Sequence, residues 1–321
     1  MSAIRSIAVI GAGTMGHALA LVHALGGCEV QLQDTDPARL EAAPKLIGAA
    51  LETLGEAGGG DAPDAAAVLD RIAMGPELEN AVASADLVVE AVVEDRAVKQ
   101  EVFAAIDRAA RDEAIVASNT SYLDVFPLIP AARQPRAAIA HWYTPPYIID
   151  LVDLAPGPET RPEVIDTLRD FYAGLGKRPV VFETLISGYI ANRLQAAIGL
   201  EIYRLLDEGL VAPQDIDDSI VHGLALRMAT LGHLKKADYT GLDMARRALA
   251  NRTYTPPEPK GGSATLDRLI AAGRSGVMAG AGFYDYGGRP AVDLFRERDV
   301  KLLKLKRALR AIEEDEADAA G

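Results

Sequence analysis

The 321-residue sequence contains one cysteine, Cys28, and one tryptophan, Trp142, and only 5% of its residues are aromatic. A single cysteine excludes an internal disulfide framework, so we expect a reducing compartment and predict the cytoplasm. No apolar run reaches the roughly 18 residues that a membrane-spanning helix needs. The apolar stretch near the amino end, residues 7–10, is also too short for a signal peptide.

Positive charge is scarce as well. The chain has 33 Lys and Arg against 46 Asp and Glu, which gives a formal net charge of −13. This balance argues against a broad nucleic-acid surface and against binding to an anionic membrane surface. We therefore predict no nucleic-acid partner and no membrane partner, and we predict no metal site.

What the chain does contain is an ordinary globular composition, with 49% apolar and 25% charged residues, and a length that suits two domains. Strands and helices alternate through its first half, which predicts an α/β fold with a Rossmann-type, doubly wound parallel sheet. The expected strands are residues 4–10, 29–33, 86–93, 114–117, 136–141 and 179–182. A helical hairpin near residues 37–72, with a flexible break at 56–63, is expected as an insertion after the second strand.

After residue 186 the pattern becomes nearly all helical. We therefore predict a first domain over residues 1–186 and a smaller, all-helical domain over residues 187–321. Helices are expected at 189–208, from about 212, and at 239–251, 264–272 and 293–315. Apolar residues at helical spacing, such as Leu224, Leu226, Leu231 and Leu234, require a partner surface.

Residues 11–16 read GAGTMG and directly follow the first expected strand. The next helix, the second strand and Asp34 at its end complete the context of a dinucleotide-binding fingerprint. Gly11 permits a tight turn, Gly13 lets the backbone approach a pyrophosphate, and Gly16 allows close helix–strand packing. The predicted cofactor-binding residues are Gly11, Ala12, Gly13, Thr14, Met15, Gly16 and Asp34.

Asp34 also indicates which cofactor binds. Its carboxylate is placed to accept hydrogen bonds from ribose hydroxyls and would repel a 2′-phosphate, so we predict NAD rather than NADP. An S-adenosylmethionine enzyme remains an alternative, because the loop of such enzymes tolerates a similar glycine pattern.

The stretch around His141 has two unusual features. Apolar residues precede His141, so it lies where a strand should end, and ligands of such sheets bind at that edge. Asp153 stands in the apolar run 151–154, where a carboxylate costs free energy unless it is hydrogen-bonded. The pair suits a general base and its orienting acid. The alternative is a core histidine and a solvent-facing acid on a half-exposed strand.

Several motifs in a fixed order extend this pattern over nearly the whole chain. They are the glycine loop, VVEAVVE at 88–94 with Lys99, SNTS at 118–121, His141 with Pro145, GYIANRL at 188–194 and GFYDY at 282–286. With these motifs the chain resembles the 3-hydroxyacyl-CoA dehydrogenase family, including its lambda-crystallin/gulonate dehydrogenase branch. The resemblance implies an NAD-dependent oxidation of a 3-hydroxy substrate to its 3-oxo form.

The resemblance also implies roles for single residues. His141 corresponds to the general base, and Asp153 corresponds to the carboxylate that orients it. Ser121 is similar to the serine that hydrogen-bonds the reacting oxygen, and Asn192 to the asparagine that steadies the site from the helical domain. The further cofactor contacts that it implies are Glu94, Lys99, Ser121 and Thr144.

Two of these positions depart from the family pattern. The family usually has glutamate where Asp153 stands and commonly has asparagine where Thr144 stands. The shorter carboxylate implies a shifted histidine, a water in the gap or a structural role for Asp153. A hydroxyl replaces only part of the hydrogen bonding of an amide.

The inserted hairpin bears on the substrate. CoA-type members contact the nucleotide part of CoA there through basic residues, whereas residues 42–63 offer Lys45 alone, against Glu52, Glu56 and Asp61. Val277 and Met278 also stand where lysines are common. We therefore favour a free β-hydroxy acid or another non-CoA substrate over the alternative, a CoA thioester of fatty acid metabolism. A non-catalytic NAD-binding protein is a more distant alternative. Because family members pair through the helical domain, we expect a homodimer through residues 187–321.

Overall fold

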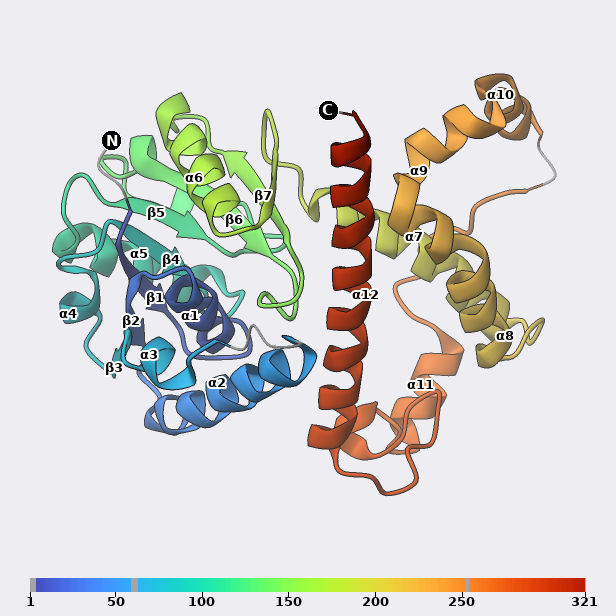
Figure 1. The fold of residues 1–321 in the computed structure, drawn as a ribbon, viewed down its shortest axis with the longest axis horizontal. Helices are drawn as coiled ribbons and strands as arrows, with labels where there is room; N and C mark the ends of the chain where they lie inside the picture. Colours follow the sequence, from blue (N-terminus) through green and yellow to red (C-terminus); the bar gives the residue numbers. More distant parts are fainter. Residues whose placement is uncertain (1–3, 59–62, 252–253, 321) are drawn as a thin grey trace. The chain divides into compact units, whose positions relative to one another are not determined.

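The computed structural model describes residues 4–58, 63–251 and 254–320. The chain divides into two compact units, Met1–Ile190 and Ala191–Gly321. The first unit alternates strands and helices, and the second is helical, as the sequence pattern predicts (Figure 1). The expected break at 56–63 falls partly on residues 59–62, which lie outside the described residues, while residues 56–58 continue the preceding helix.

An eight-stranded sheet lies at the centre of the first unit, with the strand order β3-β2-β1-β4-β5-β6-β7-β8. The central strands are short, continuous apolar runs, as expected for strands that are buried on both faces. The strands are β1 (Ser6–Ile10), β2 (Glu29–Gln33), β3 (Ile72–Gly75), β4 (Leu87–Glu90), β5 (Ile115–Ser118), β6 (Ala137–Trp142), β7 (Leu151–Pro156) and β8 (Arg178–Val181).

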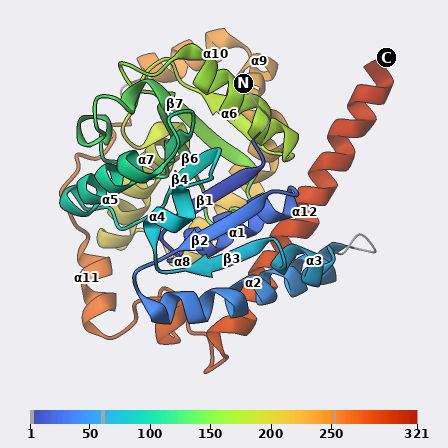
Figure 2. The same ribbon diagram turned by 90° about the vertical axis from the view of Figure 1, so that its left-hand side faces the viewer.

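Helices cover both faces of this sheet (Figure 2). The core on one face includes residues of α1 (Gly16–Leu25), α2 (Pro37–Gly58), α3 (Ala65–Leu69) and α6 (Pro162–Gly174). The core on the other face includes residues of α4 (Leu78–Val82), α5 (Arg96–Ala109) and the 3-10 turn η1 (Phe126–Leu128), and a further 3-10 turn, η2, spans Gln134–Arg136. The doubly wound architecture is thus confirmed.

The sheet is not parallel throughout, which corrects the sequence-based prediction. Strand β7 runs antiparallel to β6, whereas the other neighbouring pairs are parallel. The connection between them, residues 143–150, is shorter than the dozen or so residues that a parallel crossover needs. The resulting register pairs His141 directly with Asp153.

The second unit consists of helices and turns. They are α7 (Tyr189–Asp207, which begins within the first unit), α8 (Pro213–Asp218), the π-helical turn η3 (Ser219–Ala225), α9 (Leu226–Thr240), α10 (Leu242–Ala250), α11 (Ala264–Ala271), the 3-10 turn η4 (Val277–Ala279) and α12 (Ala291–Ala320). Gly232 interrupts α9 with a φ of 69°. Within the described ranges, no helix is both long and apolar enough to cross a membrane.

Candidate active site

The glycine loop between β1 and α1 has the geometry that the fingerprint requires. Gly11 has a φ of 100°, and a Cβ atom there would lie 2.7 Å from the Ala91 carbonyl oxygen. A Cβ atom on Gly16 would lie 1.6 Å from the Gly11 oxygen, so both positions need glycine. A Cβ atom on Gly13 would meet only the Arg39 guanidinium, at 3.7 Å. The loop therefore leaves room for a bound group above Gly13.

The start of α1 is suited to an anion. Met15 precedes the helix and makes no side-chain cap, so the described residues leave the first N–H groups of α1 open to a phosphate. These observations fit NAD, with the loop at Gly11, Ala12, Gly13, Thr14, Met15 and Gly16 holding the pyrophosphate.

Asp34 follows β2 and lies beside the glycine loop. Its Oδ2 accepts a hydrogen bond of 2.8 Å from the Ala12 N–H, and its Oδ1 accepts one of 2.9 Å from the Asp36 N–H. Arg39 lies next to it, with Nη1 3.5 Å from Asp34 Oδ2. The carboxylate is therefore fixed at the end of β2, beside the glycine loop, which is the place of the ribose-binding acid in the dinucleotide fingerprint.

His141 lies near the carboxyl end of β6 and is 3% exposed. The antiparallel register brings Asp153 of β7 beside it, with His141 Nδ1 3.6 Å from Asp153 Oδ2. On the other side of the ring, Ser121 Oγ lies 3.2 Å from His141 Nε2. The structure thus brings together three of the four residues predicted as catalytic, and it excludes the alternative in which Asp153 faces solvent, since that residue is 1% exposed.

Two tyrosines enclose the imidazole of His141. Tyr189 stacks on it at a centroid distance of 4.4 Å, and Tyr143 meets it edge-on at 4.7 Å. Tyr189 has a φ of 49°, an uncommon conformation for a residue with a side chain, and its hydroxyl donates to the Thr120 oxygen over 2.6 Å. Tyr143 donates to Asp153 Oδ2 over 2.6 Å.

The sequence patterns predict no contact of either tyrosine with His141 or Asp153. Tyr189 lies in the GYIANRL motif, which was the one available signal for it. Burial, followed by the hydrogen bond to Asp153 and the charge of Asp153, raises the pKa of the Tyr143 phenol well above its ordinary value. Tyr143 is therefore a stable hydrogen-bond donor to this carboxylate.

Glu94 organises the loop that presents Ser121. Its Oε1 accepts hydrogen bonds from the Thr120 hydroxyl and from the N–H groups of Ser121, Tyr122 and Leu123, at 2.7 to 3.2 Å. Burial raises the pKa of the Glu94 carboxyl, but the bonds from Tyr122 and Thr120 outweigh it and hold this pKa below its ordinary value.

Lys99 lies beneath this loop and is 1% exposed. Its Nζ lies 2.7 Å from Glu90 Oε1 and 3.4 Å from Glu94 Oε2. Ser118 donates to the other oxygen of Glu90 over 2.5 Å. Losing one partner of such a buried pair typically costs about 3–5 kcal/mol. Lys99 therefore joins α5 to the ends of β4 and β5.

Two further contacts join the loops around the site. Thr144 Oγ1 lies 3.2 Å from Met15 Sδ, which connects the glycine loop to the segment after His141. The Asn119 side chain accepts a hydrogen bond of 2.8 Å from the Trp142 N–H. Asn192, the fourth residue predicted as catalytic, lies in the first turn of α7 and belongs to the second unit.

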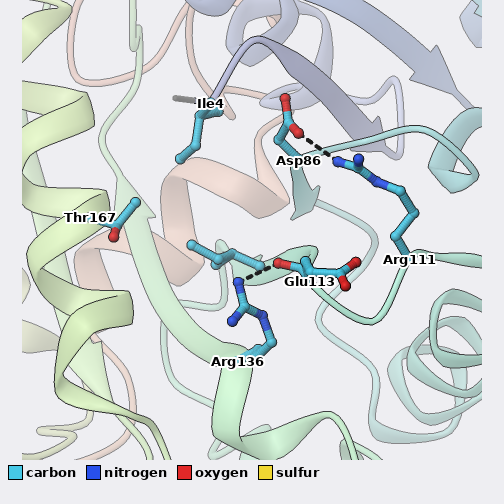
Figure 3. Close-up of a pocket in the computed structure, with 7 residues that line it drawn as sticks. Ile4, Asp86, Arg111, Glu113, Arg136 and Thr167 are labelled. Carbon is cyan, nitrogen blue, oxygen red and sulfur yellow. Dashed lines mark hydrogen bonds and ion pairs between the residues drawn. The ribbon is translucent and has the colours of Figure 1, made fainter. Parts of the chain in front are cut away.

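A separate pocket of about 250 Å³ lies at the opposite, amino-terminal edge of the sheet (Figure 3). Arg111 pairs there with Asp86 at 2.5 Å, and Arg136 donates to the Glu113 backbone oxygen. Arg111 and Asp86 in this pocket thus neutralise each other. No group of three or more potential metal ligands occurs among the residues that the structure describes.

Comparison with known proteins agrees with this geometry. The family model of the NAD-binding domain of 3-hydroxyacyl-CoA dehydrogenase matches residues 6–185, and the model of the C-terminal domain of the same enzyme matches residues 188–286. The glycine pattern left NAD and S-adenosylmethionine open as cofactors, and the first match decides in favour of NAD.

Individual relatives cover almost the whole chain. A 5-formyl-3-hydroxy-2-methylpyridine 4-carboxylate 5-dehydrogenase of Mesorhizobium japonicum is 31% identical over 97% of this chain and 100% of its own. A 3-hydroxybutyryl-CoA dehydrogenase of Mycobacterium tuberculosis is 32% identical over 88% of this chain and 99% of its own.

Among solved structures, an NAD+-dependent dismutase described as a dehydrogenase of the same pyridine carboxylic acid superimposes with a TM-score of 0.86. It is 30% identical and covers 96% of this chain and 99% of its own. The resemblance expected from the motifs is thus confirmed, and the chain belongs to the 3-hydroxyacyl-CoA dehydrogenase family of NAD-dependent dehydrogenases.

Proposed function

We propose that the protein oxidises the secondary alcohol of a small β-hydroxy acid, or of another substrate without CoA, to the 3-oxo product. The observation that carries this proposal is the cluster of Ser121, His141 and Asp153 at the carboxyl edge of an NAD-binding sheet. Alcohol oxidation needs a base at the hydroxyl and a donor to the developing carbonyl oxygen, and this cluster supplies both.

The cluster divides the chemistry among three side chains. His141 Nε2 takes the hydroxyl proton as the C–H hydrogen leaves with its electron pair, and Ser121 hydrogen-bonds the reacting oxygen. Asp153 orients the imidazole and stabilises its protonated form. Bound NAD supplies the acceptor for the hydride. We further propose that Asn192 steadies the substrate from the second unit.

The cofactor contacts divide into three groups. The residues of the glycine loop bind the pyrophosphate, Asp34 binds the adenosine ribose, and Ser121 and Thr144 lie toward the nicotinamide. Glu94 remains a candidate contact of the nicotinamide ribose, because its side chain is 36% exposed. We assign Lys99 to holding Glu90 and Glu94, since its side chain is 1% exposed.

The preference for a substrate without CoA rests on charge and on the relatives. Lys45 is the one basic residue among residues 42–63, and neither Val277 nor Met278 can pair with a phosphate. The Mesorhizobium japonicum relative, whose full length is matched, is named for a pyridine carboxylate. A CoA thioester remains the alternative, supported by the relative named for 3-hydroxybutyryl-CoA.

The setting follows from the composition. We infer a cytoplasmic homodimer that pairs through the second unit. The single cysteine supports a reducing compartment. Exposed apolar side chains on the helices of the second unit support pairing.

A panel assay tests the proposal. Purified protein is incubated with NAD and with β-hydroxy acids, aromatic hydroxymethyl and formyl carboxylates and the matching CoA esters, and NADH absorbance is followed. We expect turnover of a free carboxylate and its loss by at least about a hundredfold in His141→Ala, whose base is missing. Efficient reduction of acetoacetyl-CoA with a low KM would contradict the substrate preference, and activity that survives His141→Ala would contradict the assigned base.

A further inference from the structure

Tyr143 follows the last residue of β6, two positions after His141. Its hydroxyl donates to Asp153 Oδ2 over 2.6 Å, and that same oxygen faces His141 Nδ1 at 3.6 Å. One carboxylate oxygen thus serves a phenol and an imidazole, and only the phenol lies at hydrogen-bonding distance.

The short side chain of Asp153 explains why a second donor is useful. A carboxylate that is 1% exposed is costly unless it is hydrogen-bonded, and the 3.6 Å gap to the imidazole leaves that contact weak. Asp150 offers no substitute, because it lies 3.5 Å from Lys177 Nζ. The Tyr143 hydroxyl supplies the hydrogen bond that the buried Asp153 carboxylate needs, and it holds Oδ2 of that carboxylate on the side that faces His141.

Tyr143 also restrains the imidazole itself. Its ring meets His141 at an interplanar angle of 82°, while Tyr189 stacks on the imidazole at 23°. The His141 imidazole is therefore held between the edge-on ring of Tyr143 and the stacked ring of Tyr189. The Tyr143 hydroxyl also donates its hydrogen bond to the Asp153 carboxylate.

We propose that Tyr143 is a positioning residue, which fixes the Asp153 carboxylate beside His141 and compensates for the missing methylene of the aspartate. This inference rests on the proposed function, in which His141 is the base. Because burial and the neighbouring Asp153 raise the pKa of the phenol, Tyr143 remains a donor throughout the acidic and neutral range.

The expected pH effect follows from competition for one oxygen. Ser121 faces the ring from the loop after β5, Asp153 from β7 and Tyr189 from the start of α7. Glu94 acts on Tyr189 and Tyr122 acts on Tyr143 through their charges. Only Asp153 can stabilise a protonated imidazole through Nδ1. Without the phenol, Asp153 loses its fixed orientation but stays opposite His141 through the register of β6 and β7. The carboxylate also loses the donor that shares its charge, so it stabilises the protonated imidazole more strongly, and the acid limb of activity moves to higher pH.

The experiment compares Tyr143→Phe with wild type and with Tyr143→Phe/Asp153→Glu. In Tyr143→Phe we expect kcat to fall about fivefold or more, KM for NAD to stay constant, and the acid limb of kcat/KM to move up by about 0.5–1 pH unit. The longer carboxylate reaches the imidazole unaided, so the double variant should recover to within about threefold of wild type.

Tyr284→Phe is the matched control, because Tyr284 makes a 2.6 Å hydrogen bond to Asp217 in the second unit. It should leave both kcat and the pH profile unchanged. A wild-type profile in Tyr143→Phe would overturn the inference. So would a loss of activity with no shift of the acid limb and no recovery in the double variant, since a purely structural role predicts that result.

A measurement without NAD or substrate separates this inference from the proposed function. The ring nitrogen signals of His141, assigned with His141→Gln, are followed by NMR as a function of pH. A midpoint that moves upward in Tyr143→Phe supports the inference even if the substrate panel fails, and an unmoved midpoint overturns it.

Discussion

The Asp153 carboxylate is buried between the Tyr143 phenol and the His141 imidazole. We expect its charge to matter more for catalysis than its shape. In Asp153→Asn the amide oxygen still accepts the Tyr143 hydroxyl, but the residue no longer stabilises a protonated imidazole. We expect kcat to fall at least about tenfold with unchanged affinity for NAD, because the glycine loop is unaffected. Steady-state kinetics and calorimetry check this, and an unchanged kcat would mean that another group orients His141.

We propose that Asp34 and Arg39 together determine which dinucleotide binds. The Asp34 carboxylate repels a 2′-phosphate, whereas Arg39, 3.5 Å away, is a cation that could pair with one. In Asp34→Ser we expect the ratio of kcat/KM for NAD to that for NADP to fall by about a hundredfold, or about 2.7 kcal/mol.

Asp34→Ser/Arg39→Gln is the matched control for this change. Its kcat/KM with NADP should not rise above that of wild type, whereas its kcat/KM with NAD should fall as it does in Asp34→Ser. An equal kcat/KM with NADP in this double variant and in Asp34→Ser would contradict the role of Arg39.

The residues of the site were predictable to different degrees. His141, Ser121 and Asp34 lie in motifs whose spacing is local, so the sequence was enough to single them out. Tyr143 was not predictable, because its partner depends on the register of β6 with β7. Lys99 was expected near the cofactor. Its burial depends on the meeting of α5, β4 and β5, which no local sequence pattern encodes.

Among the elements, short strands such as β2 and β5 and long helices such as α7 and α12 lie where the sequence pattern predicts them, whereas β3, α4 and α9 were missed. The four or five residues of β3 and α4 carry too little periodicity. Gly232 interrupts the longer α9. Strand β7 was not among the expected strands, so its antiparallel direction was missed as well. Its short connection to β6 would have indicated an antiparallel pair.

Helix α1 carries a pH-sensitive group into the core. His23 is fully buried against Trp142 and Tyr172, and burial lowers its pKa to about 4, with help from Lys177 and against the hydrogen bond to Leu19. The unfolded chain binds a proton at this histidine near pH 6.5. The contribution of neutral, buried His23 to the free energy of unfolding is therefore fully present above pH 6.5 and is lost as the pH falls toward 4. The loss amounts to about 3 kcal/mol.

Urea unfolding at several pH values tests the role of His23. His23→Gln should flatten the slope of the unfolding free energy between pH 6.5 and 4, whatever its effect on stability at pH 8. The exposed His233→Gln should keep the wild-type slope. An equally steep slope in His23→Gln would assign the pH dependence to other groups.

At the scale of the whole molecule, the second unit differs from the first in what it exposes. Large apolar side chains are exposed along residues 219–240, among them Val221, Leu224, Leu226, Met228, Leu234 and Tyr239. Leu234 is 80% exposed and Leu226 is 68% exposed. Soluble monomers rarely leave large apolar patches in contact with water, so this segment is suited to a symmetric contact with a second copy.

Light scattering after gel filtration tests this pairing. We expect wild-type protein to elute at twice the mass of one chain, and Leu226→Glu/Leu234→Glu to elute as a monomer, because two buried charges at each copy of a twofold contact lack partners. Leu46→Glu, on α2 and 47% exposed, is the control and should stay dimeric. A dimeric double variant would exclude residues 219–240 as the contact, and a monomeric wild type would exclude the homodimer itself.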